Sequence, residues 1–138
     1  MTTQPGLFDD AEVISTYSRA QAIEDGVLVD LRAGELDELV RQAGIRFPVA
    51  CTAEVFSSCI DLTPAAKRAG NDIKGRCWDV LWMLRQAIRA ARPGTTRITF
   101  KVAVVRERVR PTPTELVAVC GPGDDMEPVI TIQFPGQD

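Results

Sequence analysis

The chain has 138 residues, 45% hydrophobic and 25% charged, which is typical of one globular domain and excludes a disordered or fibrous protein. The formal net charge of -3 disfavours a general nucleic-acid binder, although residues 71–110 carry ten basic against three acidic side chains and form a local basic zone. Histidine is missing, which excludes Ser-His-Asp and Cys-His catalytic groups and histidine-based metal sites.

The N-terminal region begins with residues 1–12, which lack hydrophobic periodicity and contain three acids, so we expect a flexible tail followed by one domain over residues 13–138. Ser18, with Gln21 three residues later, is typical of a helix N-cap, and Gly26 is placed to end that short helix. Residues 27–31 then predict a short buried strand.

Three further short elements are expected before the middle of the chain. Residues 33–44 place apolar side chains at helical spacing and end at Gly44, a natural helix terminator. Residues 49–60 are ambiguous, because the first four could extend a strand while the rest fit a helix; we favour a helix that begins after Thr52 as cap. Thr63 and Pro64 are set as N-cap and first residue of a helical turn that Gly70 ends.

The strongest periodicity belongs to residues 72–91, which predict the central helix of the fold. Apolar residues recur there at steps of three and four, at Ile73, Cys77, Val80, Leu81, Leu84, Ile88 and Ala91. Asp72 at the start and Arg89 with Arg92 at the end match the helix dipole.

After residue 96 the hydrophobic period changes from 3.6 to 2, which predicts strands. Residues 97–108, 115–120 and 128–134 read as three strands joined by short turns, and such a series favours an antiparallel meander. The predicted fold class is therefore α+β in two layers: a C-terminal three-stranded antiparallel meander packed on a long central helix, with shorter N-terminal helices and one short N-terminal strand.

The first predicted strand runs into three alternating arginines, Arg106, Arg108 and Arg110. Alternate residues of a strand share a face, so these side chains would continue the face that buries Ile98. Arginines at a strand end often keep an edge soluble. They could instead form a platform for phosphate or carboxylate groups, because guanidinium groups bind both in bidentate fashion.

The turn between the last two predicted strands, "GPGDD", carries Asp124 and Asp125. Glycine and aspartate at these positions suit a tight connection. The adjacent carboxylates could also contribute to a divalent-cation site, but that site would need more ligands than this spacing supplies. We therefore expect no bound metal and no cofactor.

A second stripe on the central helix consists of Trp78, Trp82, Arg85 and Arg89 at steps of four, three and four. A tryptophan pair at this spacing is typical of core or interface packing. Tryptophan beside arginine is also the composition of binding hot spots and of a stacked base next to a phosphate.

The four cysteines, Cys51, Cys59, Cys77 and Cys120, match no CxxC pair and no zinc spacing, which favours buried reduced thiols over a metal site or a catalytic thiol. No signal peptide, lipidation motif or apolar run of membrane-spanning length is present, so we expect a cytoplasmic protein without a membrane partner.

Four sequence blocks together resemble one protein family: "VISTYSRAQAIEDGVLVDL", "RFPVACTAEVF", "GRCWDVLWMLRQAIR" and "VCGPGDDMEPVITIQFPG". They are similar to the family of unknown function numbered 6573, whose members resemble proteins of phages, plasmids and integrative elements. The resemblance covers residues 13–136. It implies a mobile-element context and assigns no catalytic residues.

The leading functional hypothesis is a non-enzymatic accessory binding protein, acting as a counter-defence factor that binds a host protein or an anionic nucleotide-like ligand. The nine residues of the arginine series, the Trp/Arg stripe and the aspartate pair are its candidate binding residues. One alternative is a metal-dependent enzyme that acts on phosphoesters or nucleotides with Asp124 and Asp125; another is sequence-independent nucleic-acid binding. A homodimer that buries Trp78 and Trp82 is also expected.

Overall fold

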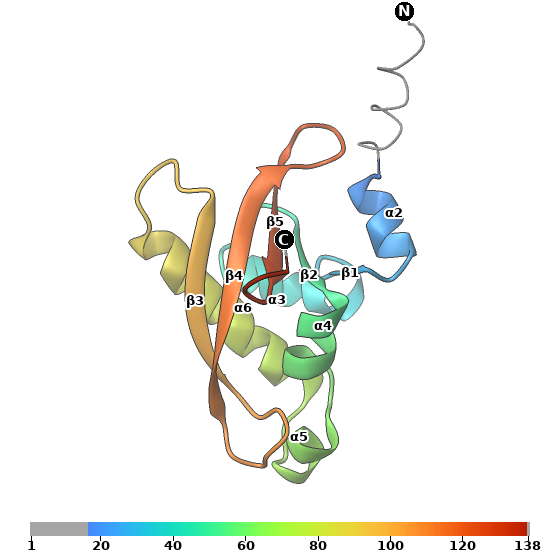
Figure 1. The fold of residues 1–138 in the computed structure, drawn as a ribbon, viewed down its shortest axis with the longest axis vertical. Coiled ribbons are helices and arrows are strands. Elements are labelled where there is room, and N and C mark those ends of the chain that lie inside the picture. Colours follow the sequence, from blue (N-terminus) through green and yellow to red (C-terminus); the bar gives the residue numbers. More distant parts are fainter. Residues whose placement is uncertain (1–16, 138) are drawn as a thin grey trace, which may run out of the picture.

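Five strands form one mixed sheet in the order β1-β2-β5-β4-β3 in the computed structural model, which describes residues 17–137 (Figure 1). The predicted tail, residues 1–12, lies outside the described residues. β2 and β5 are parallel, and all other neighbouring strands are antiparallel. The strands are β1 (Leu28–Asp30), β2 (Val49–Thr52), β3 (Arg97–Val104), β4 (Thr112–Pro122) and β5 (Pro128–Gln133).

The sheet is larger than the three strands predicted for the meander. The α+β class is confirmed, but β1 and β2 extend the sheet beyond β5, with Val49 opposite Ile130 in the parallel register. Parallel strands cannot be joined by a hairpin, so no turn motif in the sequence indicates that two distant segments pair in this way. β5, the last strand, therefore lies in the middle of the sheet.

β3 ends at Val104, so the prediction of a strand reaching residue 108 is wrong. Both Val104 and Val105 are buried, which breaks the alternation of a strand. Val105 packs with Ala65 and Ala66 in a small second cluster and draws the chain away from the sheet. Residues 106–110 consequently form a loop with no strand face to share.

Within the described residues seven helical segments accompany the sheet, and the three predicted caps, Ser18, Thr52 and Thr63, are confirmed. The side chains of Ser18, Thr52, Thr63 and Asp72 each accept a backbone N–H bond at the start of their helix. Among the described residues, no helix combines the length and apolar character needed to cross a bilayer. The segments are α2 (Arg19–Glu24), the 3-10 turn η1 (Gly34–Leu36), α3 (Asp37–Gln42), α4 (Ala53–Val55), the π-helical turn η2 (Phe56–Ile60), α5 (Pro64–Arg68) and α6 (Ile73–Ala90).

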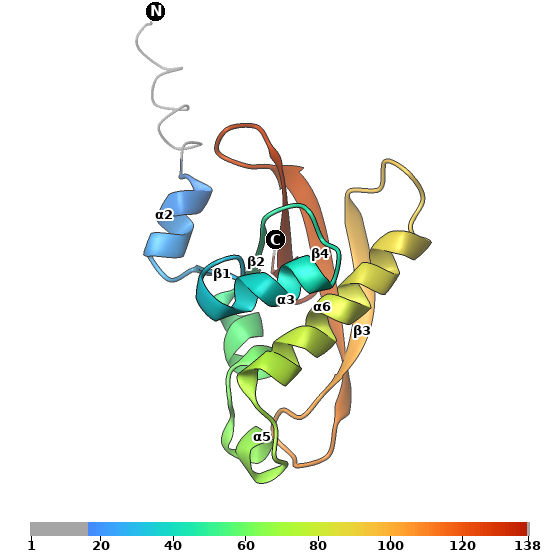
Figure 2. The ribbon, with the colours of Figure 1, turned by 180° about the vertical axis from the view of Figure 1, so that it is seen from behind.

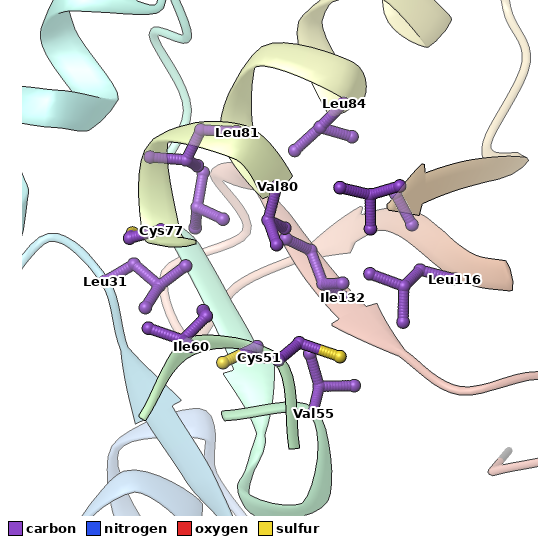
Figure 3. Close-up of a cluster of buried hydrophobic side chains, with 14 of the residues drawn as sticks. Leu31, Cys51, Val55, Ile60, Cys77, Val80, Leu81, Leu84, Leu116 and Ile132 are labelled. Atoms are coloured by element: carbon purple, nitrogen blue, oxygen red, sulfur yellow. The ribbon is translucent and has the colours of Figure 1, made fainter. Parts of the chain in front are cut away.

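The core lies between α6 and the sheet. α6 and α3 lie over the same face of the sheet (Figure 2), and α6 buries its apolar stripe there. Figure 3 shows Val80 and Leu84 of α6 beside Leu116 of β4 and Ile132 of β5, with all four side chains fully buried. This packing fixes the C-terminal half of α6 against the strand ends that line the pocket described below.

Arg76 is a buried arginine within this core, and only 5% of it is exposed. Its guanidinium donates to the backbone carbonyls of Ile60 at 3.1 Å, Val105 at 2.7 Å and Ser58 at 2.8 Å. One side chain of α6 thereby holds η2 and the end of β3 together. Burial lowers the pKa of this guanidinium.

Candidate anion-binding pocket

An open pocket of about 870 Å³ lies between the C-terminal half of α6, the connection from α3 to β2, and the neighbouring ends of β3, β4 and β5. This volume suits a small-molecule ligand. The lining residues are Arg32, Arg41, Gly44, Ile45, Arg46, Phe47, Leu84, Arg85, Ile88, Thr95, Thr96, Ile98, Ala118, Cys120 and Ile130. Four arginines and no acidic side chain are therefore among the described residues of the lining.

The floor of the pocket is aliphatic because it continues the core face of the sheet. Ile98 of β3 stands opposite Ala118 of β4, and Cys120 stands opposite Ile130 of β5. Leu84 of α6, which also belongs to the lining, is fully buried. Phe47 is 41% exposed and adds an aromatic ring to the lining.

Two of the pocket arginines share one carboxylate. Arg32 donates from Nε to Asp37 Oδ1 at 2.5 Å, and Arg41 approaches Asp37 Oδ2 with its Nε at 3.0 Å. The hydrogen bond from Arg32 lowers the pKa of Asp37, and the charge of Arg41 acts in the same direction. The hydrogen bond from Arg32 uses Nε, and the ion pair of Arg41 with Asp37 is also made at Nε.

The other two pocket arginines, Arg46 and Arg85, form no ion pair within the described part of the chain. Arg85 lies against the turn that ends α3, where a Cβ added at Gly44 would stand 3.5 Å from the guanidinium. Gly44 has a φ of +80°, which glycine adopts without strain, and the chain turns there to place Arg46 and Phe47 in the lining. The predicted end of the helix at Gly44 is confirmed.

Of the predicted Trp/Arg stripe, only Arg85 lines the pocket. Trp78 and Trp82 stack on each other with ring centroids 5.7 Å apart. Trp78 packs partly against the core, whereas Trp82 is 45% exposed. Arg89 is exposed one turn beyond Arg85 and lies outside the lining.

The predicted arginine series lies at the other end of β3, in the loop next to α5 (Figure 1). Arg106 is partly buried and lies over the ring of Phe134, 5.2 Å from its centroid, while Arg108 and Arg110 are exposed. Because β3 has ended, the premise of a continuous arginine-bearing strand face is wrong. Their role in binding stays a prediction.

Asp124 in the β4–β5 hairpin caps a helix that is far away in sequence. Its carboxylate accepts the backbone N–H groups of Arg19 at 2.8 Å and Ala20 at 3.0 Å, while Ser18 caps the next N–H of α2. The side chain of Arg19 makes a second contact with the sheet, because its guanidinium donates to Thr131 Oγ1 and to the carbonyl of Ile130 in β5.

Asp125 is exposed in the same hairpin, where its backbone N–H donates to the Glu127 carboxylate at 3.0 Å. In the part of the chain that is described, no group of three or more Cys, Asp or Glu side chains is arranged to hold a metal ion. Asp124 is thus engaged in capping α2, and Asp125 lies beside Glu127 in the hairpin.

Three of the four cysteines are buried and free. Burial raises the pKa of the Cys51 and Cys59 thiols and raises that of Cys77 to about 12, so these groups are held as unreactive thiols at neutral pH. Cys120 is partly exposed and lines the pocket.

Sequence reasoning missed Arg32, Arg41 and Arg46 as pocket residues. They come from the more acidic half of the chain and from separate segments, so neither local charge nor periodicity connects them. The burial of Arg76 could have been recognised in the sequence, because its spacing of three from Ile73 and four from Val80 places it on the apolar stripe of α6.

A comparison with protein families finds one match: a model described as Family of unknown function (DUF6573) matches residues 5–138. The resemblance seen in the four sequence blocks is thereby confirmed. No curated protein and no solved structure matches the chain.

Proposed function

The chain belongs to the family of unknown function DUF6573, and we propose that it is a non-enzymatic binding protein that holds an anionic small molecule in the pocket between α3, α6 and the sheet. One observation carries the proposal: four guanidinium groups surround an aliphatic floor of a pocket of about 870 Å³.

The electrostatics of the lining favour an anion. Four positive charges and the single carboxylate of Asp37 leave a surplus of positive charge, and Arg46 and Arg85 have no acidic partner among the described residues. Guanidinium groups donate two parallel hydrogen bonds to a carboxylate or phosphate, and such charge-assisted bonds are stronger than neutral ones. An apolar wall with a few convergent polar groups is the usual form of a small-molecule site.

The wider role predicted from the sequence stays a prediction: an accessory protein of a mobile genetic element that acts as a counter-defence factor by binding a host protein or an anionic nucleotide-like ligand. Binding of a host protein, sequence-independent nucleic-acid binding, a metal-dependent enzyme using Asp124 and Asp125, and a homodimer also stay predictions. Asp124 is engaged in capping α2, which gives the enzyme alternative no additional support.

The test uses 1-anilinonaphthalene-8-sulfonate, which joins an anionic sulfonate to an apolar aromatic body and fluoresces in apolar surroundings. We expect saturable binding of one dye to each chain. Arg85→Ala should weaken binding about tenfold or more, because a hydrogen bond between charged groups contributes about 1.5–3 kcal/mol.

Arg89→Ala is the matched control, since it removes the same charge from the same helix outside the lining. Its dye affinity should equal that of the unaltered protein. Circular dichroism should show that both variants are folded. Equal loss in the two variants, or binding of several dyes per chain, would contradict the assignment of the pocket.

A further inference from the structure

We infer that the natural ligand of the pocket is an organic phosphate with an apolar body and not a nucleotide. The inference rests on the binding function proposed above and specifies the chemistry of both ends of the ligand. It follows from which polar groups of the lining are already bonded and which are not.

The backbone donors of the lining are largely occupied. In the described residues, five of their N–H groups in turns and between elements donate to carbonyls within the protein: Gly44 to Arg41, Ile45 to Val40, Thr95 to Arg92, Cys120 to Thr96 and Ile130 to Pro48, at 2.9, 3.2, 3.1, 2.8 and 2.8 Å. These groups are unavailable to read the edge of a base or the hydroxyls of a sugar.

The uncharged side chains offer little more. The Thr95 hydroxyl donates to the carbonyl of Arg92 at 2.7 Å, so its proton is used. The hydroxyl of Thr96 makes no hydrogen bond within residues 17–137 and is exposed. The remaining uncharged surface is aliphatic or comes from Phe47 and the Cys120 thiol.

A nucleoside matches this surface poorly. Its base and ribose carry several donors and acceptors, and each one that is buried without a partner opposes binding. An alkyl or aryl group has no such groups and gains from removing apolar surface from water. The body of the ligand is therefore apolar.

The charged groups of the lining favour phosphate over carboxylate. A phosphate monoester carries a charge of about -1.5 to -2 at neutral pH and offers three acceptor oxygens. Arg46 and Arg85 are without acidic partners in the described chain, and Arg32 and Arg41 share the single carboxylate of Asp37. The lining thus carries more guanidinium groups than its acidic partner engages, and a phosphate with three acceptor oxygens and a greater charge suits this surplus better than a carboxylate.

The experiment compares three probes by isothermal titration calorimetry with the full chain. Octyl phosphate and octanoate share a body and differ in headgroup, whereas octyl phosphate and adenosine monophosphate share a headgroup and differ in body. We expect octyl phosphate to bind about tenfold or more tightly than either of the others. Arg85→Ala should reduce the preference for octyl phosphate over octanoate, and Arg89→Ala should preserve it.

Each of the other possible titration results would contradict a specific part of the inference about the ligand. Adenosine monophosphate binding as tightly as octyl phosphate would overturn the apolar body, and octanoate binding as tightly would overturn the phosphate, while the proposed function would stand in both cases. Binding of the fluorescent sulfonate alone would overturn this inference only. Failure of the dye and all three probes would overturn the proposed function as well.

The source of the phosphate is distinguished with lipid vesicles. Phosphatidylcholine vesicles with and without phosphatidic acid are sedimented with the protein. Binding that depends on phosphatidic acid and on Arg85 identifies a lipid headgroup, whereas binding of octyl phosphate without vesicle binding identifies a soluble ester. Both results support an organic phosphate with an apolar body.

Discussion

Replacement of Arg76 by methionine is expected to destabilise the fold by about 3 kcal/mol, because methionine keeps the length of the side chain but has no hydrogen-bond donor. The buried guanidinium serves three backbone carbonyls, those of Ile60, Val105 and Ser58. A buried acceptor left without a partner costs about 1–3 kcal/mol, which sets an upper range of about 3–9 kcal/mol for all three.

Two effects place the expected value at the lower end of that range. Removing a buried cation also removes the cost of taking its charge out of water, which is several kcal/mol in real proteins. In addition, Ser58 is only partly buried, so water can replace the lost donor there. For a domain of this size, a loss of about 3 kcal/mol corresponds to a decrease in Tm of roughly 10 °C.

The assay is urea unfolding followed by the fluorescence of Trp78 and Trp82, both on the same helix as Arg76. Arg89→Met is the control, since Arg89 is exposed and its replacement should change the free energy of unfolding by less than about 0.5 kcal/mol. Arg76→Lys should fall between the two, because an ammonium group cannot reach three carbonyls in the geometry of a guanidinium. A loss below about 1 kcal/mol in Arg76→Met, or full stability in Arg76→Lys, would refute the reasoning.

Three further predictions concern the cap, the shared carboxylate and the thiols. Asp124→Ala should cost about 1 kcal/mol locally, as for loss of an N-cap, and should accelerate hydrogen exchange of the Arg19 and Ala20 amides; unchanged exchange would contradict the capping role. Because Arg32 lowers the pKa of Asp37, the carboxylate stabilises the fold above its ordinary pKa, and this contribution is lost as the pH falls through the lowered value. Asp37→Asn should therefore be less stable than the unaltered protein at pH 7 and should approach it in acid, and a constant difference across pH would argue against this linkage. In the folded protein a maleimide should modify Cys120 alone, and octyl phosphate should slow the reaction, whereas modification of two or more thiols per folded chain would show that the buried cysteines are accessible.

The helices were predictable because their signals are local. Ser18, Thr63 and Asp72 are capping residues that precede helical periodicity, and each one caps its helix in the structure. The prediction of a strand reaching residue 108 passed over Val104 and Val105, two adjacent valines at which the alternation of apolar and polar residues stops. Both are buried in the structure, Val104 in the main core and Val105 beside Ala65, and β3 ends between them.

The candidate site was predicted only at Arg85. Its stripe was visible because helical spacing relates residues within one element. The pocket also contains Arg32, Arg41 and Arg46, which reach it only because β1 and β2 extend the sheet and α3 packs beside α6. No short-range sequence pattern predicts that these three residues lie close to Arg85. The sequence therefore predicted an anion-binding surface from its basic zone, while the pocket combines that zone with arginines from the acidic half.

The position of β5 has a consequence for how the protein folds during synthesis. β5 joins β2 to β4, yet of the five described strands it is the last to leave the ribosome. Until it arrives, the β1–β2 pair and the β3–β4 pair each have an open edge, and long-range pairing of this kind is slow and exposed to aggregation. A chain that stops before Pro128 lacks the only strand that connects both halves of the described sheet, so termination just before β5 should be as damaging as termination before β3.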